Sequence, residues 1–109
     1  MKIDVLGTEY EIKEMTEAEY PKLKGSSGLC EIYAREIIIR KDEGPDPNHY
    51  SNLEACIRAT VRHEIIHAFF AESGLRANCD YASNEELVDW IAHQFPKLAR
   101  AFKAAGCED

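Results

Sequence analysis

The segment from His63 to His67, with the sequence H-E-I-I-H, restricts what this chain can fold into more than any other feature. The surrounding sequence predicts a helix, and residues four positions apart on a helix lie on the same face, one turn from each other. The imidazoles of His63 and His67 can therefore reach one metal ion, and H-E-x-x-H is a known zinc-binding signature. Glu64 lies about 100° around the helix from His63, where it can act as general base for a metal-activated water.

A buried helix from about 51 to 73 is expected around this segment. Ser51 is the candidate N-cap, Glu54 completes a capping box with it, and Gly74 is the candidate residue after the C-cap. Apolar residues lie on both sides of the helix: Leu53, Ile57, Val61, Ile65 and Ala68 on one, and Ile66, Phe69 and Phe70 on the other. Ionisable side chains in a buried helix are costly without partners, and a bound metal ion would supply one.

An acidic segment, Asn84 to Asp89, opens a second predicted helix. A catalytic zinc site needs three protein ligands and one open position, and Glu85 is the candidate third ligand. Asp89 shares a helical face with Glu85, so its carboxylate can accept a hydrogen bond from a ligand histidine and fix that imidazole. Glu86 is the rival third ligand. Ser83 and Glu86 form a second possible capping box, which would leave Glu85 available for the metal.

The combination of H-E-x-x-H with the later N-E-x-x-x-D resembles the gluzincin metallopeptidases. The short chain is most similar to the minimal gluzincins and to the small prophage-encoded zinc peptidase-like proteins, although the matching residues span only positions 63–89. No G-x-x-H follows the motif, so the metzincin pattern is absent. The resemblance implies a zincin-like fold, a general base and acid at Glu64, and support of a ligand histidine by Asp89. It also implies one Zn²⁺ per chain, bound by His63, His67 and Glu85.

Length and charge narrow the class of protein and of partner. The 109 residues are expected to form one domain, from 1 to 109. A formal net charge of −7 argues against binding to nucleic acid or to an anionic membrane. No apolar run approaches the length of a membrane span, and the first residues do not begin a secretory signal. We therefore expect a cytoplasmic protein, whose oligomeric state the sequence leaves open.

The cysteines are too widely spaced to indicate a zinc ribbon, because no C-x-x-C pair is present: Cys30, Cys56, Cys79 and Cys107. In a reducing cytoplasm they are expected to be free thiols, some of them buried as small apolar groups. Cys79 is closest in sequence to the expected site and remains an alternative ligand.

The fold predicted from these patterns is α+β, with a small antiparallel sheet beside the buried motif helix. Two hairpins are expected from alternating apolar residues: strands at 2–6 and 9–14, then at 29–33 and 36–40. A short helix is expected within 15–23, and the run Ile37 to Ile39 favours an interior strand.

Two further helices are expected after the motif helix, from about 84 to 94 and from 96 to 105. Pro96 suits the first turn of the second of them, and Gly106 suits its end. Their expected apolar stripes are Leu87, Trp90 and Ile91 in the first, and Leu98, Ala101, Phe102 and Ala105 in the second.

The function that these expectations favour is a zinc-dependent peptidase, a hydrolase acting on a peptide or protein substrate. Glu64 would take a proton from the attacking water and return it to the leaving amine. A further donor for the developing oxyanion is usual, and the candidates are Tyr81, taken first, with His93, His49 and Tyr50. The 29–40 hairpin is expected to bind an extended peptide along its edge strand.

Two alternatives stay open. The first alternative to a peptidase is a zinc-stabilised regulatory or interaction module of prophage type, in which the metal mainly holds helices together. The second is a protein without metal, whose histidines are satisfied in the core. The presence of Glu64 favours catalysis, because a purely structural site has no use for that base.

Overall fold

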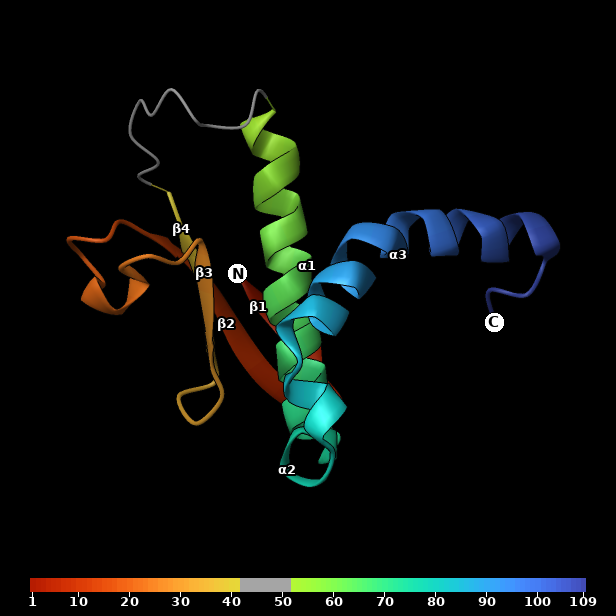
Figure 1. The fold of residues 1–109 in the computed structure, drawn as a ribbon, viewed down its shortest axis with the longest axis horizontal. Helices are drawn as coiled ribbons and strands as arrows, with labels where there is room; N and C mark the ends of the chain where they lie inside the picture. The colour runs from red at the N-terminus through yellow and green to blue at the C-terminus, as the bar shows by residue number, and fades with distance from the viewer. Residues whose placement is uncertain (42–51) are drawn as a thin grey trace.

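The structure is a computed structural model that describes residues 1–41 and 52–109. Within these residues one mixed sheet is formed, in the order β1-β2-β4-β3, by β1 (Lys2–Val5), β2 (Thr8–Met15), β3 (Gly28–Glu31) and β4 (Glu36–Arg40). Helix α1 (Leu53–Glu72) packs against the sheet, and helix α3 (Glu85–Ala105) packs against α1 on the side away from the strands (Figure 1). The fold class is therefore α+β, as predicted.

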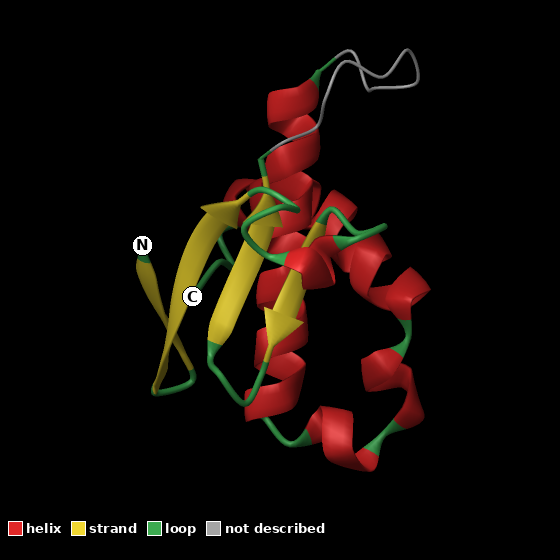
Figure 2. Cartoon of the chain, turned by 90° about the vertical axis from the view of Figure 1, so that its left-hand side faces the viewer, coloured by secondary structure: helices red, strands yellow, loops and turns green. Residues whose placement is uncertain are grey.

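The sheet is mixed, which corrects the expectation of an antiparallel sheet. Both hairpins are antiparallel, but β2 and β4 pair in parallel, with Ile12 opposite Ile37. Parallel pairing needs a connection that returns the chain to the starting end of the first strand. Residues 16–27 carry the chain to the far edge of the sheet, and β3, which runs antiparallel to β4, brings it back to that end. As a consequence β4 lies inside the sheet and β3 forms its edge, as Figure 2 shows.

The 16–27 connection is fastened to the end of β4 by Arg40. Its guanidinium donates hydrogen bonds to the carbonyl oxygens of Leu23 and Ser26, at 2.6 and 2.9 Å, and contacts Glu17 at 2.9 Å. The short helix expected here is reduced to a 3₁₀ turn at Pro21–Leu23. Leu23, at the end of this turn, is fully buried and so holds the connection against the rest of the fold.

The core lies between the sheet and α1. Alternation along the strands directs one set of side chains toward the helix, and these side chains form a buried cluster with Ala68: Val5, Tyr10, Ile37 and Ile39. Ile57, Val61 and Ile65 of α1 pack against this cluster. Ile38 points to the other face and is also fully buried, which confirms the prediction of an interior strand.

Helix α1 is less buried than the sequence predicted. Only Glu64 and Ala68 are fully buried along it, and Phe69 is 40% exposed. The N-cap is Asn52, whose side chain accepts a hydrogen bond from the Ala55 amide at 3.1 Å, whereas Ser51 lies outside the described residues. Gly74 follows the C-cap with a φ of 84°, as predicted.

One helix, α3, replaces the two helices that were expected to meet at Pro96. Proline has no N–H, so the carbonyl oxygen four residues earlier, that of Ala92, receives no backbone hydrogen bond from position 96. The Nε of Arg62 on α1 donates to that oxygen at 2.6 Å. The donor from the neighbouring helix satisfies this carbonyl, and the helix continues through Pro96.

The buried face of α3 also differs from the prediction. Val88 and Ala92 are its fully buried residues, whereas Trp90 is 58% exposed. The expected packing of the last turns is absent, because residues 99–109 are all exposed, and Figure 1 shows this end of the helix projecting from the body. The N-cap is Asn84 and not Ser83, since the Asn84 side chain accepts a hydrogen bond from the Leu87 amide at 2.7 Å.

Short segments that were not predicted join α1 to α3. They are α2 (Leu75–Asn78), which begins after Gly74, and a 3₁₀ turn at Asp80–Ser83. They reverse the chain so that the start of α3 lies beside α1. Among the helices in the described part of the chain, none is long and apolar enough to cross a membrane.

Replacing Arg62 by Met is expected to lower the free energy of unfolding by about 1–3 kcal/mol, because the carbonyl of the buried Ala92 loses its donor. The same replacement should cost less in a Pro96→Ala background, where residue 96 regains an N–H for that carbonyl. Urea unfolding of the wild type, both single variants and the double variant, in chelator, gives the coupling energy. A coupling below about 0.3 kcal/mol would mean that the two residues do not share this carbonyl.

Candidate metal centre

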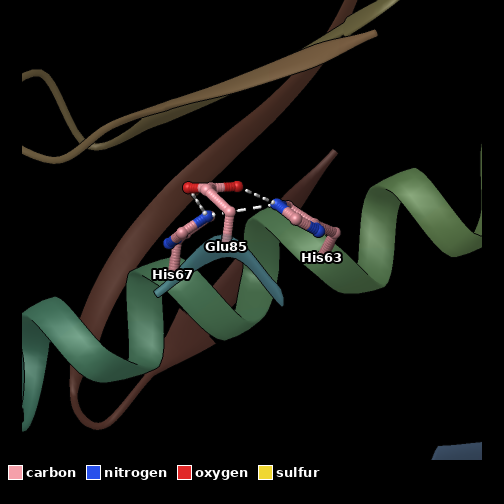
Figure 3. Close-up of side chains that lie close together, drawn as sticks. All are labelled: His63, His67 and Glu85. Carbon is pink, nitrogen blue, oxygen red and sulfur yellow. Dashed lines mark hydrogen bonds and ion pairs between the residues drawn. The ribbon is translucent and has the colours of Figure 1, made fainter. Parts of the chain in front are cut away.

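The imidazoles of His63 and His67 leave α1 one turn apart and meet the carboxylate of Glu85, the first residue of α3. Figure 3 shows the carboxylate lying across both rings, with its two oxygens directed at different histidines. The Nε2 of His63 is 2.9 Å from Glu85 Oε2, and the Nε2 of His67 is 2.9 Å from Glu85 Oε1. Side chains from two helices therefore converge on one point.

The spacing of these atoms fits a single metal ion. The Nε2 atoms of His63 and His67 are 3.1 Å apart, and the two rings meet edge to face at an interplanar angle of 68°. Tetrahedral zinc with Zn–N bonds of about 2.0–2.1 Å separates two ligand nitrogens by about 3.3 Å. One ligand atom from each of the three side chains lies within 4.8 Å of the others. Two imidazoles and one carboxylate are also a donor set that suits zinc.

The hydrogen bonding of His63 gives an independent reason for a cation at this point. Its Nδ1 is 3.3 Å from Asp89 Oδ1, while its Nε2 is 2.9 Å from Glu85 Oε2. A neutral imidazole has one N–H, so it can donate to only one of these two carboxylates. If the proton is on Nδ1, Asp89 is satisfied and the lone pair on Nε2 faces a carboxylate oxygen. A second proton on the ring would remove that conflict, and so would a metal ion held by Nε2 and Glu85, in which case Asp89 would fix the tautomer.

Asp89 extends this network along α3. Its second oxygen, Oδ2, lies 3.5 Å from Nε2 of His93, one turn later on the same helix. The Asp89 carboxylate thus lies between His63 and His93 and connects the cluster to a side chain that lines the neighbouring cavity.

Glu64 lies beside the cluster but does not belong to it. It is only 6% exposed, and its Oε1 is 3.9 Å from Nε2 of His63. Burial raises the pKa of Glu64 to about 7, the charge of His63 opposes this rise, and the charge of Glu85 adds to it. A carboxyl group with a pKa near neutrality can both accept and release a proton, which is what a general base and acid requires.

Gly28 on the edge strand allows β3 to approach Glu64 closely. A Cβ at this position would lie 2.9 Å from Cγ2 of Thr60 and 3.2 Å from Cγ of Glu64. A side chain at position 28 would therefore clash with Thr60 and press against Glu64. The close approach places the outer edge of β3, which pairs with no other strand of the described residues, directly beside the candidate base.

His67 lies in a drier environment than an exposed histidine. Burial lowers its pKa, the charge and hydrogen bond of Glu85 raise it, and the charges of His63 and Arg76 lower it further. The net direction favours the neutral imidazole, which is the form that binds metal.

Two cavities flank the cluster and share one border. A cavity of about 810 Å³ lies on the side of His63, and a smaller one of about 350 Å³ lies on the side of His67. Both are lined by the same residues at their junction: Ser26, Gly28, Glu64 and Glu85. The two cavities thus form a groove, referred to below as the β3 groove, with Glu64 and Glu85 near its middle.

The remaining predicted residues take separate positions. Glu86 is exposed and is not part of the three-residue cluster. Tyr81 lies in the 3₁₀ turn before α3 and is 54% exposed, and it does not line either half of the β3 groove. His93 does line the larger half. His49 and Tyr50 lie outside the described residues.

Cysteine does not enter the cluster. Cys30, Cys56, Cys79 and Cys107 are all free thiols, as predicted, and none of them joins the three-residue group. Burial raises the pKa of Cys30 to about 12, and the charge of Glu64 adds to this rise, so this thiol, which lines the smaller half of the groove, is held in its protonated form.

Sequence reasoning missed three residues that shape the site: Gly28, Arg62 and Arg76. Each acts through a contact between segments far apart in the chain, and none belongs to a motif. The only signal for Arg62 in the sequence is Pro96 inside a helical pattern. A proline there leaves the carbonyl of Ala92 without its helical donor, so that carbonyl needs a donor from another segment.

Comparison with known proteins adds no relative: no protein-family model, no curated protein and no solved structure matches this chain.

Proposed function

We propose that this chain is a small zinc-dependent peptidase of the gluzincin type. The observation that carries the proposal is the convergence of His63, His67 and Glu85 on one point, with the buried Glu64 beside it and a groove on both sides. The α+β arrangement, with the motif on the helix that packs against the sheet and the third acidic group on the next long helix, supports a zincin-like fold.

His63, His67 and Glu85 would hold the ion, and Asp89 would keep the Nδ1 proton of His63 in place. When bound, zinc supplies a Lewis acid that polarises a carbonyl and lowers the pKa of water from about 15.7 to about 7. His63, Glu85 and His67 line the β3 groove, so a bound ion would be within reach of a substrate that lies in the groove.

Glu64 moves the proton in the proposed reaction. Its carboxylate accepts a proton from the attacking water while the water oxygen bonds to the peptide carbonyl carbon. The same carboxyl group then donates that proton to the amide nitrogen as the C–N bond breaks, so an amine and a carboxylic acid result. A pKa of about 7 for Glu64 suits both transfers at neutral pH.

The substrate in this proposal is an extended peptide in the β3 groove. β3 is the edge strand of the sheet, and Gly28, Leu29 and Cys30 line the smaller cavity. An unpaired edge can add one further strand through backbone hydrogen bonds. His93, paired with Asp89 and lining the larger cavity, is now a better-placed donor for the developing oxyanion than Tyr81.

A second candidate function is a zinc-stabilised regulatory module. The observation that favours it is that the three ligands join α1 to α3, so a bound ion would hold the two helices together. Chelation that unfolds the protein, combined with no hydrolysis of labelled casein at any zinc concentration, would favour this module over a peptidase.

Replacing Glu85 by Gln is expected to weaken zinc binding by more than about 100-fold, because one ligand is lost, and Asp89→Asn by about 10–100-fold. Competition titration with a chromophoric zinc chelator at neutral pH measures both affinities. Glu86→Gln is the matched control, adjacent and exposed, and should bind zinc like the wild type. Equal affinity in the Glu85 and Glu86 variants would rule out the assignment of the third ligand.

Replacing Glu64 by Gln should reduce hydrolysis of labelled casein by at least about 100-fold, because the proton acceptor is lost while the metal ligands remain. The zinc content of the variant, measured by elemental analysis, should match that of the wild type. Unchanged hydrolysis in the zinc-loaded variant would eliminate Glu64 as the base.

The metal-free protein is expected to lose stability as the pH rises. The pKa of Glu64 is about 7 in the folded state and near 4.5 when unfolded, so the folded form binds the proton more tightly. The favourable contribution is complete below pH 4.5 and is lost as the pH rises through 7. Glu64→Gln cannot ionise, so in chelator it should be more stable than the wild type by about 1–3 kcal/mol at pH 8.

Urea unfolding of both proteins between pH 4 and pH 8 tests this dependence. The difference between wild type and Glu64→Gln should shrink toward low pH. A difference that does not change with pH would show that Glu64 is already ionised throughout this range.

A further inference from the structure

The smaller half of the β3 groove contains a positive charge that the proposed chemistry does not use. Arg76 lies on α2, between the end of α1 and the start of α3, and lines the same 350 Å³ cavity as His67, Glu85 and Gly28. α2 is set at this place by the left-handed turn at Gly74, whose φ is 84°. The turn that follows α1 therefore places Arg76 at the wall of the groove.

Arg76 has no partner among residues 1–41 and 52–109: none of them makes a hydrogen bond or an ion pair with it. The nearest acidic residue on the preceding helical turn is Glu72, and both of its carboxylate oxygens are already engaged. Glu72 Oε1 accepts a hydrogen bond from the Tyr10 hydroxyl at 2.7 Å, and Oε2 accepts one from Thr8 at 3.1 Å. As far as residues 1–41 and 52–109 are concerned, the guanidinium is thus available to a ligand.

The charge of Arg76 reaches the interior of the groove. It lowers the pKa of His67 in addition to the larger effect of burial, and it opposes the burial that raises the pKa of Cys30. These two side chains come from α1 and from the edge strand, and both line the same cavity as Arg76.

The acidic surroundings of Arg76 restrict the binding of an anionic ligand to the neighbourhood of its guanidinium. The protein carries a formal net charge of −7, and Glu64 and Glu85 border the same cavity. An anionic ligand would be repelled from most of this surface. Arg76, which has no partner in the described part of the chain, is the place in this cavity that would attract it. Guanidinium groups bind carboxylates through two parallel N–H···O hydrogen bonds, a geometry that favours one orientation of the ligand.

We propose that Arg76 forms a carboxylate-binding subsite in the β3 groove, on the His67 side of the metal centre. The subsite rests on the proposed peptidase function and defines its substrate class: a peptide that presents a carboxylate a short distance from the cleaved bond. That carboxylate is either an Asp or Glu side chain or the C-terminal group of the peptide, and the shared chemistry is recognition by the guanidinium.

The first test measures binding without turnover. Zinc-loaded Glu64→Gln protein is titrated with fluorescent hexapeptides that differ only in one residue, Glu or Gln, and in their C-terminus, free or amidated. The acidic member of at least one pair should bind about tenfold more tightly than its neutral partner. A preference confined to the Glu peptides identifies a side-chain carboxylate, and one confined to the free C-terminus identifies a terminal carboxylate.

The second test assigns that preference to Arg76. Arg76→Gln, in the same Glu64→Gln background, should remove the preference, Arg76→Lys should keep part of it, and Arg76→Glu should reverse it. Arg58→Gln is the matched control, because Arg58 is an exposed arginine on α1 that lines neither half of the groove. A carboxylate that binds only to the metal would be insensitive to Arg76, so a preference that survives Arg76→Gln overturns the subsite.

Cleavage-site profiling on a peptide mixture, with the zinc-loaded wild type and Arg76→Gln, separates this inference from the proposed function. Cleavage enriched near carboxylates in the wild type alone supports both. Cleavage without such enrichment overturns the subsite and leaves the peptidase. No cleavage, together with Arg76-dependent binding of acidic peptides, overturns the peptidase and leaves the subsite. Equal binding of acidic and neutral peptides overturns the subsite whatever the cleavage result.

Discussion

The contact between α1 and α3 is the constraint on which the candidate site depends. The imidazoles come from α1 and the carboxylates of Glu85 and Asp89 come from α3, so the cluster exists only where these helices lie side by side. The Arg62 Nε that donates to the Ala92 carbonyl fixes the two helices at the residue next to His63. Pro96 makes this bond possible, because it leaves that carbonyl without its usual helical donor. A residue that normally ends a helix here helps to position a member of the candidate metal centre.

Charge explains why the site is more than a group of nearby polar residues. His63 lies between two carboxylates, and Glu64 and Glu85 border the same groove in an already acidic protein. Such a cluster is unfavourable without a cation, and a dication at the Nε2 atoms would compensate two carboxylates while orienting both rings. Burial raises the pKa of Glu64, the charge of His63 opposes this rise, and the charge of Glu85 adds to it, so the property that suits a general base is a cost in the metal-free fold. Under the proposed function, catalysis and stability would make opposite demands on Glu64.

Local patterns were sufficient to predict much of the site and of the fold. The helix around the motif, both hairpins, the interior strand at Ile37 to Ile39 and the approach of Glu85 and Asp89 to His63 follow from spacing along the chain, and the structure contains all of them. What depends on contacts between distant segments was missed. The parallel pairing of β2 with β4 is decided by the path of residues 16–27, and the continuity of α3 through Pro96 is decided by a donor on another helix. The position of Arg76 likewise depends on a turn whose direction the sequence does not specify.

X-ray absorption at the zinc edge, on protein purified without added metal or a chelating tag, tests the central claim most directly. We expect about one zinc per chain, with a first coordination shell of nitrogen and oxygen only and with the multiple-scattering signal of two imidazoles. Sulfur in that shell would place the ion on the cysteines instead of on His63, His67 and Glu85. Protein that holds no zinc, even after zinc is offered at neutral pH, would contradict the metal centre and the peptidase built on it.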